Sequence, residues 1–270
     1  MKWTEIAERI KLQQVIVDKM LEYEKSFDRV KYAEDIEALS DPLKVTDEYP
    51  ILSEKLAPDT DNVKMLLCQF YAAELMWDKY KAKGIPEDIF FASMEVHTRS
   101  IEETLAYNGS YIIDRVFWNY RQVSMTIFRL GALEYELKQK EHVIGIHIPS
   151  DADFRPESVK ASLKQIIPFC RKYFPDFADA NITCVTWLLS DVLKELLPPT
   201  SNILHFQELF EDVECEYESK WYIRFLFQMN NDTPYEQLRE ETSLQRKAKQ
   251  LLLSGRNIGT GHGRIKAEYR

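Results

Sequence analysis

HVIGIHIPSDADFRPESVKASL, residues 142–163, is the stretch that decides the fold. Its first half places Ile144, Ile146 and Ile148 at every second position, which is the pattern of a β-strand. The alternation stops at Pro149, an acidic loop follows, and Pro156 opens a helix at the first-turn position that proline tolerates. A strand that feeds a helix start through a polar loop is a common place for a ligand.

The residues before this strand predict its hairpin partner. MTIFRLGALEYEL, residues 125–137, also has period-two patterning, and KQKE, residues 138–141, is a four-residue loop between the two. With that loop, Leu137 lies opposite His142 and Glu134 opposite Gly145. The expected core face holds Leu133, Tyr135, Leu137, Ile144 and Ile146. The opposite face is expected to hold three polar side chains, Glu134, Glu136 and His147.

The rest of the second half alternates helices and strands. Helices are expected over residues 156–174, 198–213 and 234–255, and strands over 182–190 and 220–228. The strand 182–190, ITCVTWLLS, is nearly all apolar and predicts a central strand covered on both faces. The last segment, RNIGTGHGRI at 256–265, is rich in glycine.

The first half has the periodicity of helices. Residues 5–27 and 59–84 have apolar residues near helical spacing, and the second run ends in lysines followed by Gly84, a typical helix stop. Pro86 is expected to open a further helix to residue 107, whose His97 is interpreted as structural. The predicted fold class is α+β, with an all-helical domain at 1–122 followed by a mixed α/β sheet domain at 123–270.

Composition narrows the class of protein. The chain of 270 residues has a formal net charge of -9, which argues against a nucleic-acid partner because phosphate binding needs a basic face. Its four cysteines show no metal-ligand spacing, so no metal is expected and reduced thiols in the cytoplasm are the simplest account. We expect no secretion signal and no membrane span.

Four stretches carry a resemblance to a known family. RLGALEYEL, IGIHIPSDADF, SVKASLKQIIPF and WLLSDVLKELLPPTSNILHFQELFE resemble a bacterial acyltransferase-like family with a helical N-terminal domain and a C-terminal domain similar to the GNAT N-acetyltransferase fold. The likeness covers most of the chain and is best over about 115–265. It implies acyl transfer from acyl-coenzyme A to an acceptor. The family's glycine-containing diphosphate loop is missing here, because PSDADFRPES, residues 149–158, has no glycine and carries Asp151 and Asp153.

The polar face of the hairpin supplies the candidate catalytic residues. An acyltransferase needs a base that takes a proton from the acceptor amine. Glu134 or Glu136 is the predicted base, and His147 is predicted to orient the acceptor or relay the proton. The alternative is that the two glutamates form a solvated face and His147 is structural.

Two segments are candidates for holding coenzyme A. The loop at 149–158 offers Ser150, Ser158 and the start of a helix. The tail offers Arg256 with Gly259, Gly261 and Gly263, because glycine lets backbone N–H groups approach a phosphate closely. The alternative for the tail is a C-terminal segment without chemistry.

Other candidates carry less weight. Cys184 and Ser190 flank the apolar strand, where a thiol could form an acyl-enzyme, but a cysteine in such a strand is more often a buried apolar residue. Trp187, Asn202 and His205 are candidates to line a ligand site at the end of the strand, with core packing and a helix turn as alternatives.

These observations favour transfer of an acyl group from acyl-coenzyme A to an amine or similar small-molecule acceptor. The alternative is a non-catalytic module that binds a metabolite or a protein on a degenerate GNAT fold. The sequence does not identify the acceptor, the acyl chain or the oligomeric state.

Overall fold

The computed structural model describes the backbone of residues 1–270 and all of their side chains except that of Tyr107. The chain separates into two compact units, Met1–Leu130 and Gly131–Arg270. The first is helical up to its last four residues, and the second is a mixed sheet with helices. The expected α+β class is therefore confirmed.

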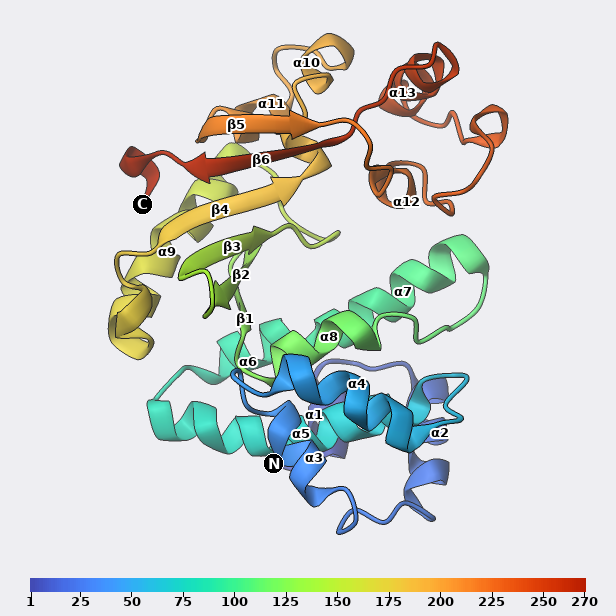
Figure 1. The fold of residues 1–270 in the computed structure, drawn as a ribbon, viewed down its shortest axis with the longest axis vertical. Coiled ribbons are helices and arrows are strands. Elements are labelled where there is room, and N and C mark those ends of the chain that lie inside the picture. Colours follow the sequence, from blue (N-terminus) through green and yellow to red (C-terminus); the bar gives the residue numbers. More distant parts are fainter. The chain divides into compact units, whose positions relative to one another are not determined.

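The first unit contains eight helices and one strand among the described residues (Figure 1). They are α1 (Trp3–Arg9), α2 (Gln14–Glu24), α3 (Ala33–Leu39), α4 (Val45–Leu56), α5 (Val63–Lys83), α6 (Glu87–Met94), α7 (Val96–Asn108), α8 (Val116–Val123) and β1 (Ile127–Leu130). Two of the expected long helices are each divided in two. The break between α1 and α2 has Lys11 in the left-handed region, at φ 56°. The first unit has more and shorter helices than expected, and it extends to Leu130, whereas the expected helical domain ends at residue 122.

The long helix α5 is the centre of the first unit. Thirteen of its 21 residues are buried, from Val63 to Tyr80, so it is surrounded by the other helices rather than lying on their surface. It ends as the sequence predicts, because Gly84 takes a left-handed conformation at φ 69° and its N–H reaches back to the last turn.

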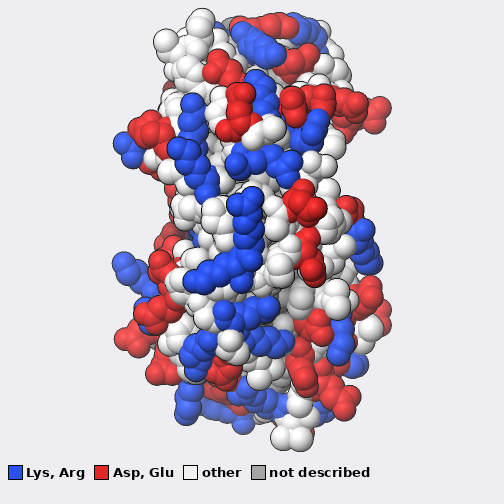
Figure 2. All heavy atoms as spheres, turned by 90° about the vertical axis from the view of Figure 1, so that its left-hand side faces the viewer, with Lys and Arg blue, Asp and Glu red and all other residues white. Residues whose placement is uncertain are grey.

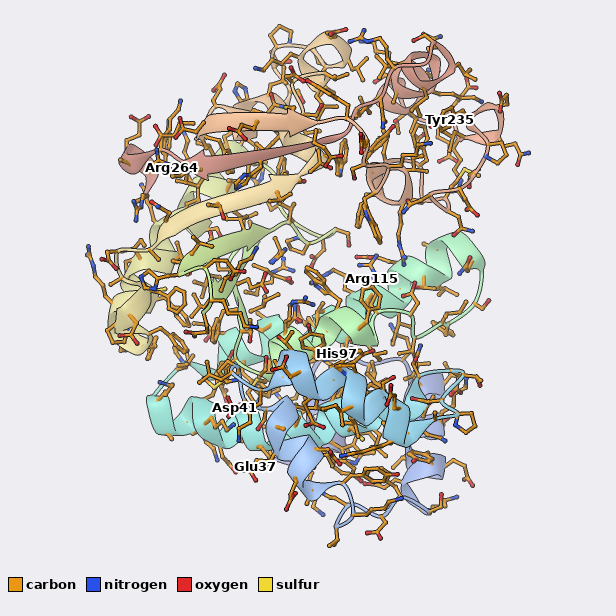
Figure 3. All side chains as sticks on the ribbon, in the orientation of Figure 1. Glu37, Asp41, His97, Arg115, Tyr235 and Arg264 are labelled. Atoms are coloured by element: carbon orange, nitrogen blue, oxygen red, sulfur yellow. The ribbon has the colours of Figure 1, made fainter. Side chains whose placement is uncertain are left out.

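His97 on α7 is buried inside this unit (Figure 3). Its ring packs on Phe70, with centroids 5.2 Å apart, and its Nδ1 lies 3.5 Å from the Asn119 amide nitrogen. Its Nε2 has no hydrogen-bond partner. Burial lowers the pKa of His97 from its usual 6.5 to about 3, so the ring is neutral at physiological pH.

We expect His97 to make the first unit less stable in mild acid. The pKa of His97 is lower in the folded unit than in the unfolded chain, so the unfolded chain binds the extra proton and acid favours unfolding. Stability should fall from about pH 6.5 downward, by at most about 1.4 kcal/mol per pH unit. Guanidinium unfolding between pH 7 and 5 measures this slope. His97→Gln should flatten it, and an unchanged slope would contradict the account.

The second unit contains five strands and several short helices. They are β2 (Leu133–Lys138), β3 (Val143–His147), α9 (Pro156–Tyr173), η1 (Pro175–Phe177), β4 (Asn181–Thr186), η2 (Trp187–Leu189), α10 (Leu193–Leu196), α11 (Asn202–Gln207), β5 (Phe210–Glu216), α12 (Tyr222–Leu226), η3 (Tyr235–Gln237), α13 (Ser243–Leu253), β6 (Thr260–Ile265) and η4 (Ala267–Tyr269).

The strands of this unit form a sheet in the order β2-β3-β4-β6-β5 (Figure 1). The pair β3 and β4 is parallel, and the other neighbouring strands are antiparallel. The parallel pair is joined through α9, as a crossover between parallel strands requires. The tail predicted only as glycine-rich is β6, an interior strand that lies between β4 and β5.

Helix α9 covers one face of the sheet. Ser162 on this helix is hydrogen-bonded to the Tyr135 hydroxyl at 2.9 Å and accepts from the Leu133 N–H at 3.2 Å. The isoleucines at 144, 146 and 182 are buried on the same face. The expected core face of the hairpin is thus the face under α9.

Two expected elements of the second unit are wrong. Residues 220–228 do not form a strand, because Tyr222 and Ile223 lie on α12 and are buried in a small core with Phe227 and residues of α13. Residues 210–213 are not the end of a helix, because β5 starts at Phe210 and pairs with β6. The acidic residues of β5 have little intrinsic preference for a β-strand. This segment is a strand because it pairs with β6, which is distant in the chain.

Candidate active site

The hairpin brings the three candidate catalytic side chains to one face. Glu134 lies directly opposite His147, and Glu136 lies opposite Gly145. The expected register was wrong by two residues, because Leu137 pairs with Ile144 and not with His142; Lys138 still pairs with Val143, and the turn is 139–142. His142 closes that turn in the left-handed region, at φ 53°. The shift keeps every side chain on its predicted face, since it is two residues and side chains alternate with a period of two.

His147 and Glu136 form a hydrogen-bonded pair. The His147 Nε2 atom lies 2.8 Å from the Glu136 Oε2 atom, and the two side chains are 26% and 13% exposed. A neutral imidazole that donates from Nε2 to a carboxylate keeps its lone pair on Nδ1. The pair can therefore accept a proton at Nδ1, and the carboxylate stabilises the imidazolium that results. Glu134 beside them is buried, at 3% exposure.

The parallel strands separate next to this pair. The last residues that pair between β3 and β4 are Ile146 and Cys184, whereas β4 continues to Thr186 and pairs there with Gly261 of β6. Beyond Cys184, the edge of β4 is not paired with β3. An extended ligand with amide groups can add to such an edge as an extra strand would.

The loop at 149–158 neutralises its own acidic residue. The Asp153 carboxylate accepts from the Arg155 guanidinium at 2.9 and 2.5 Å and from the Ser158 hydroxyl at 2.5 Å. These contacts hold the pKa of Asp153 well below its usual range. The start of a helix favours a negative charge. At the start of α9 the Asp153 carboxylate already occupies the place where a bound anion would be favoured. Ser150 lies exposed at the start of the same loop.

The glycines of the tail are required by packing within the protein. A Cβ on Gly259, which has φ 71°, would lie 2.1 Å from the Glu216 carbonyl oxygen, and one on Gly261 would lie 2.6 Å from the Leu189 carbonyl oxygen. A Cβ on Gly263 would meet Val213 at 3.0 Å. Arg256 pairs with Glu195 at 2.8 and 2.9 Å. These contacts account for the glycine cluster, and contact of these residues with a phosphate stays a prediction.

Two cavities lie in the second unit. One of about 180 Å³ is bounded by α9, α11 and the C-terminal segment, with Phe154, Lys160, His205, Phe206 and Tyr269 in its wall. Asn202 and His205 both line this cavity, whereas Trp187 does not, and a ligand site at these residues stays a prediction. The other cavity, of about 440 Å³, has Asp191, Lys194, Gln207, Cys215 and Tyr217 in its wall. Neither is lined by the three candidate catalytic residues.

The sequence did not single out Lys160, which lines the first cavity. The exposed cations of α9 are Lys160, Lys164, Arg171 and Lys172. Figure 2 views the side of the second unit that carries α9 and the C-terminus, where Lys and Arg side chains lie between Asp and Glu. Lysines at helical spacing on an exposed face are common, so only the cavity distinguishes Lys160.

Burial excludes the two further candidate nucleophiles, Cys184 and Ser190. Cys184 is 2% exposed, its thiol donates to the Ile146 carbonyl, and burial raises its pKa to about 12. Ser190 is buried and donates to the Ile258 carbonyl at 2.6 Å. Neither can attack a thioester in this state. Within the described residues, no group of three His, Cys, Asp or Glu could hold a metal ion. None of the described helices combines the length and the apolar character that crossing a membrane requires.

Comparisons with known proteins match both halves of the chain. Residues 1–125 match the model of an N-acyltransferase N-terminal domain, and residues 127–265 match that of a GNAT-like C-terminal domain. No curated protein matches.

Solved structures of acyltransferases share the fold over nearly the whole chain. A complex of an acyltransferase with decanoyl-coenzyme A and teicoplanin has a TM-score of 0.77 at 17% identity, covering 97% of this chain and 87% of that one. A complex with decanoyl-coenzyme A has a TM-score of 0.68 at 19% identity, covering 98% and 99%. The predicted family is thus confirmed. The chain belongs to the family in which an N-acyltransferase N-terminal domain precedes a GNAT-like C-terminal domain.

Proposed function

We propose that this protein transfers an acyl group from acyl-coenzyme A to a small molecule with a primary amine. The observation that carries the proposal is the His147–Glu136 pair at the end of β3, beside the point where the parallel strands separate. Family membership supports the donor, because structures with this fold have been solved with coenzyme A and acyl-coenzyme A.

In this proposal His147 is the base and Glu136 orients it. The acceptor nitrogen forms a bond to the thioester carbonyl carbon, and its proton passes to His147 Nδ1. Glu136 holds the opposite ring nitrogen and balances the new positive charge. Bound acyl-coenzyme A supplies the thioester, whose carbon–sulfur bond breaks as the thiol leaves. The proton on His147 is then available to that thiol, so the base is regenerated.

The residues that would hold coenzyme A fit it in part. The unpaired edge of β4 can bind amides, and the start of α9 presents backbone N–H groups and a positive dipole end. Arg155 is 66% exposed on its side chain and can turn from Asp153 to a phosphate. Phe154, Tyr269 and Lys160 around the smaller cavity suit an aromatic ring and a phosphate. Asp153 opposes an anion, since its carboxylate lies at the same helix start.

A titration with coenzyme A tests whether the protein binds this donor. The Asp153→Asn variant tests whether the donor lies at the start of α9. Removing this carboxylate frees Arg155 and removes a repulsion, so we expect coenzyme A to bind about three- to tenfold more tightly at low salt. Isothermal titration calorimetry measures the change. Asp212→Asn is the matched control, because Asp212 forms a similar exposed pair with Arg264 at 2.7 Å on β6 (Figure 3). Absence of binding at millimolar coenzyme A would refute the donor.

A binding module without catalysis is the second candidate. The glycine-free loop and the Asp153–Arg155 pair favour it, since both weaken a diphosphate site. This candidate predicts that no amine is acylated while a ligand still binds. Turnover that depends on His147 would exclude it.

A further inference from the structure

The second face of the sheet has an apolar side chain where one is not expected. Val185 lies on β4, an interior strand of the sheet, and its side chain is 61% exposed. The expectation that this strand is covered on both faces is therefore wrong for the face opposite α9. Parallel strands are normally covered on both faces, and the solvated face of an antiparallel sheet normally carries polar residues. An exposed valine at this place needs another explanation.

Val185 shares its face with the proposed base. Ile146 pairs with Cys184 under α9, so the next residues along the two strands, His147 and Val185, both turn to the other face. Val185 lies opposite His262 of β6, which is exposed. Gly145 contributes no side chain, and the Lys138 side chain fills the space over it, with Cε 3.0 Å from the place of an added Cβ.

The need for proton transfer to His147 places the acceptor, rather than the acyl donor, on this face of the sheet. A base must lie within about 3 Å of the proton that it removes, so the acceptor amine has to lie on the face that carries His147. His147 and Val185 are the residues that directly follow the last pair of β3 and β4, so an acceptor that reaches His147 from the β4 side of this face passes over Val185. The acyl group, in contrast, is expected to enter from the edge where β3 and β4 separate.

The charges on this face favour an amine. Glu214 lies opposite His262 and is exposed, and Glu136 lies beside His147. The cations on the same face are Arg264, which is paired with Glu211 and Asp212, and Lys138. The Lys138 side chain lies over Gly145 next to Glu136, with its Nζ atom 3.6 Å from the place of an added Cβ. An amine with an apolar body thus meets the exposed Glu214 carboxylate beyond His262 and an apolar surface at Val185.

We infer that Val185 is the floor of the acceptor site and selects a primary amine with an apolar body, with His262 as a hydrogen-bonding partner for a second polar group. This inference rests on the proposed function, because it takes the acceptor to the base His147. His147 and His262 lie on either side of Val185, at least about 10 Å apart because β3 and β4 separate there, so the acceptor spans an apolar segment between two polar ends.

Val185→Lys tests the floor. The variant removes the apolar contact and places a like charge beside the acceptor, so we expect KM for an alkyl amine to rise about tenfold or more. Its dissociation constant for coenzyme A should stay within about twofold. Val185→Ile should keep KM within about threefold, because the surface stays apolar. Leu253→Lys is the matched control, since Leu253 is 50% exposed on α13 and lies on a helix rather than on the sheet face.

His262→Ala tests the second contact. KM should rise for diamines and amino alcohols but not for monoamines of the same length. An unchanged KM in Val185→Lys overturns the inference. A changed preference for acyl chain length with an unchanged amine KM also overturns it, because the acyl chain would then lie over Val185.

A binding experiment separates failure of this inference from failure of the proposed function. Valine methyl groups are labelled in the full chain, Val185 is assigned from the spectrum of Val185→Ile, and amines are titrated. If no amine is acylated, the proposed function fails, yet a shift of the Val185 methyl signals still supports an amine site. Methyl signals that do not move with any amine overturn the site itself.

Discussion

Replacing His147 with alanine lowers kcat about a thousandfold, within the range of about 10²–10⁴ that a positioned base contributes. The reason is geometric, since His147 is the imidazole on the face beside the separating strands and its Nε2 is held 2.8 Å from Glu136. The affinity for coenzyme A should change little, because the imidazole acts on the acceptor. Steady-state kinetics with a saturating amine measures the effect, and His142→Asn on the same hairpin is the control. Asparagine tolerates the left-handed conformation of residue 142.

Glu136→Gln distinguishes a positioning role from a merely structural one. The amide oxygen still accepts from His147 Nε2, but the negative charge that balances the imidazolium is lost, so kcat should fall about 10- to 100-fold with little change in KM. In the His147→Ala background the same change should have almost no further effect on kcat, since the two residues act as a unit. Full turnover in His147→Ala would move the search for the base to the buried Glu134.

Gly261→Ala is expected to prevent normal folding of the second unit. An added Cβ would lie 2.6 Å from the carbonyl oxygen and 2.7 Å from the carbonyl carbon of Leu189, both backbone atoms that cannot turn aside. Interior overpacking costs about 1–3 kcal/mol, and a contact with rigid backbone belongs at or above the upper end. Guanidinium unfolding followed by near-ultraviolet circular dichroism measures the loss, or the protein fails to accumulate in folded form.

Gly255→Ala is the matched control for this prediction. Gly255 has φ 83° but no heavy atom within 4 Å of the added Cβ. The change therefore costs only the backbone strain of a left-handed alanine, about 1–2 kcal/mol. Equal losses in the two variants would mean that the close approach of β6 to Leu189 does not matter for stability.

Local sequence patterns predicted the elements whose residues decide their own structure. The alternation at 133–137 and 143–148 placed Glu134, Glu136 and His147 on one face and the isoleucines on the other, and both faces are as expected. Pro156 and Gly84 mark the ends of helices because their backbone preferences act locally. The shift in hairpin register left the faces unchanged, since it is a shift of two residues, which is the period of side-chain alternation in a strand.

Pairing between distant segments decided what the sequence did not show. The glycines of 259–263 looked like a phosphate loop, but β6 needs them because it passes close to Leu189 and Glu216, far away in the chain. Residues 220–228 alternate like a strand, yet Tyr222, Ile223 and Phe227 bury against α13 and form a helix.

The sequence by itself determined the order of the helical and sheet units, the polar face of the hairpin and the polar loop that enters α9. The tertiary structure alone decided that His147 meets Glu136, that β3 and β4 separate after Ile146, and that Val185 lies exposed on an interior strand. The physical reason is that patterns of period two or 3.6 specify which side of an element is apolar, whereas partners across a sheet are chosen by contacts between residues distant in the chain.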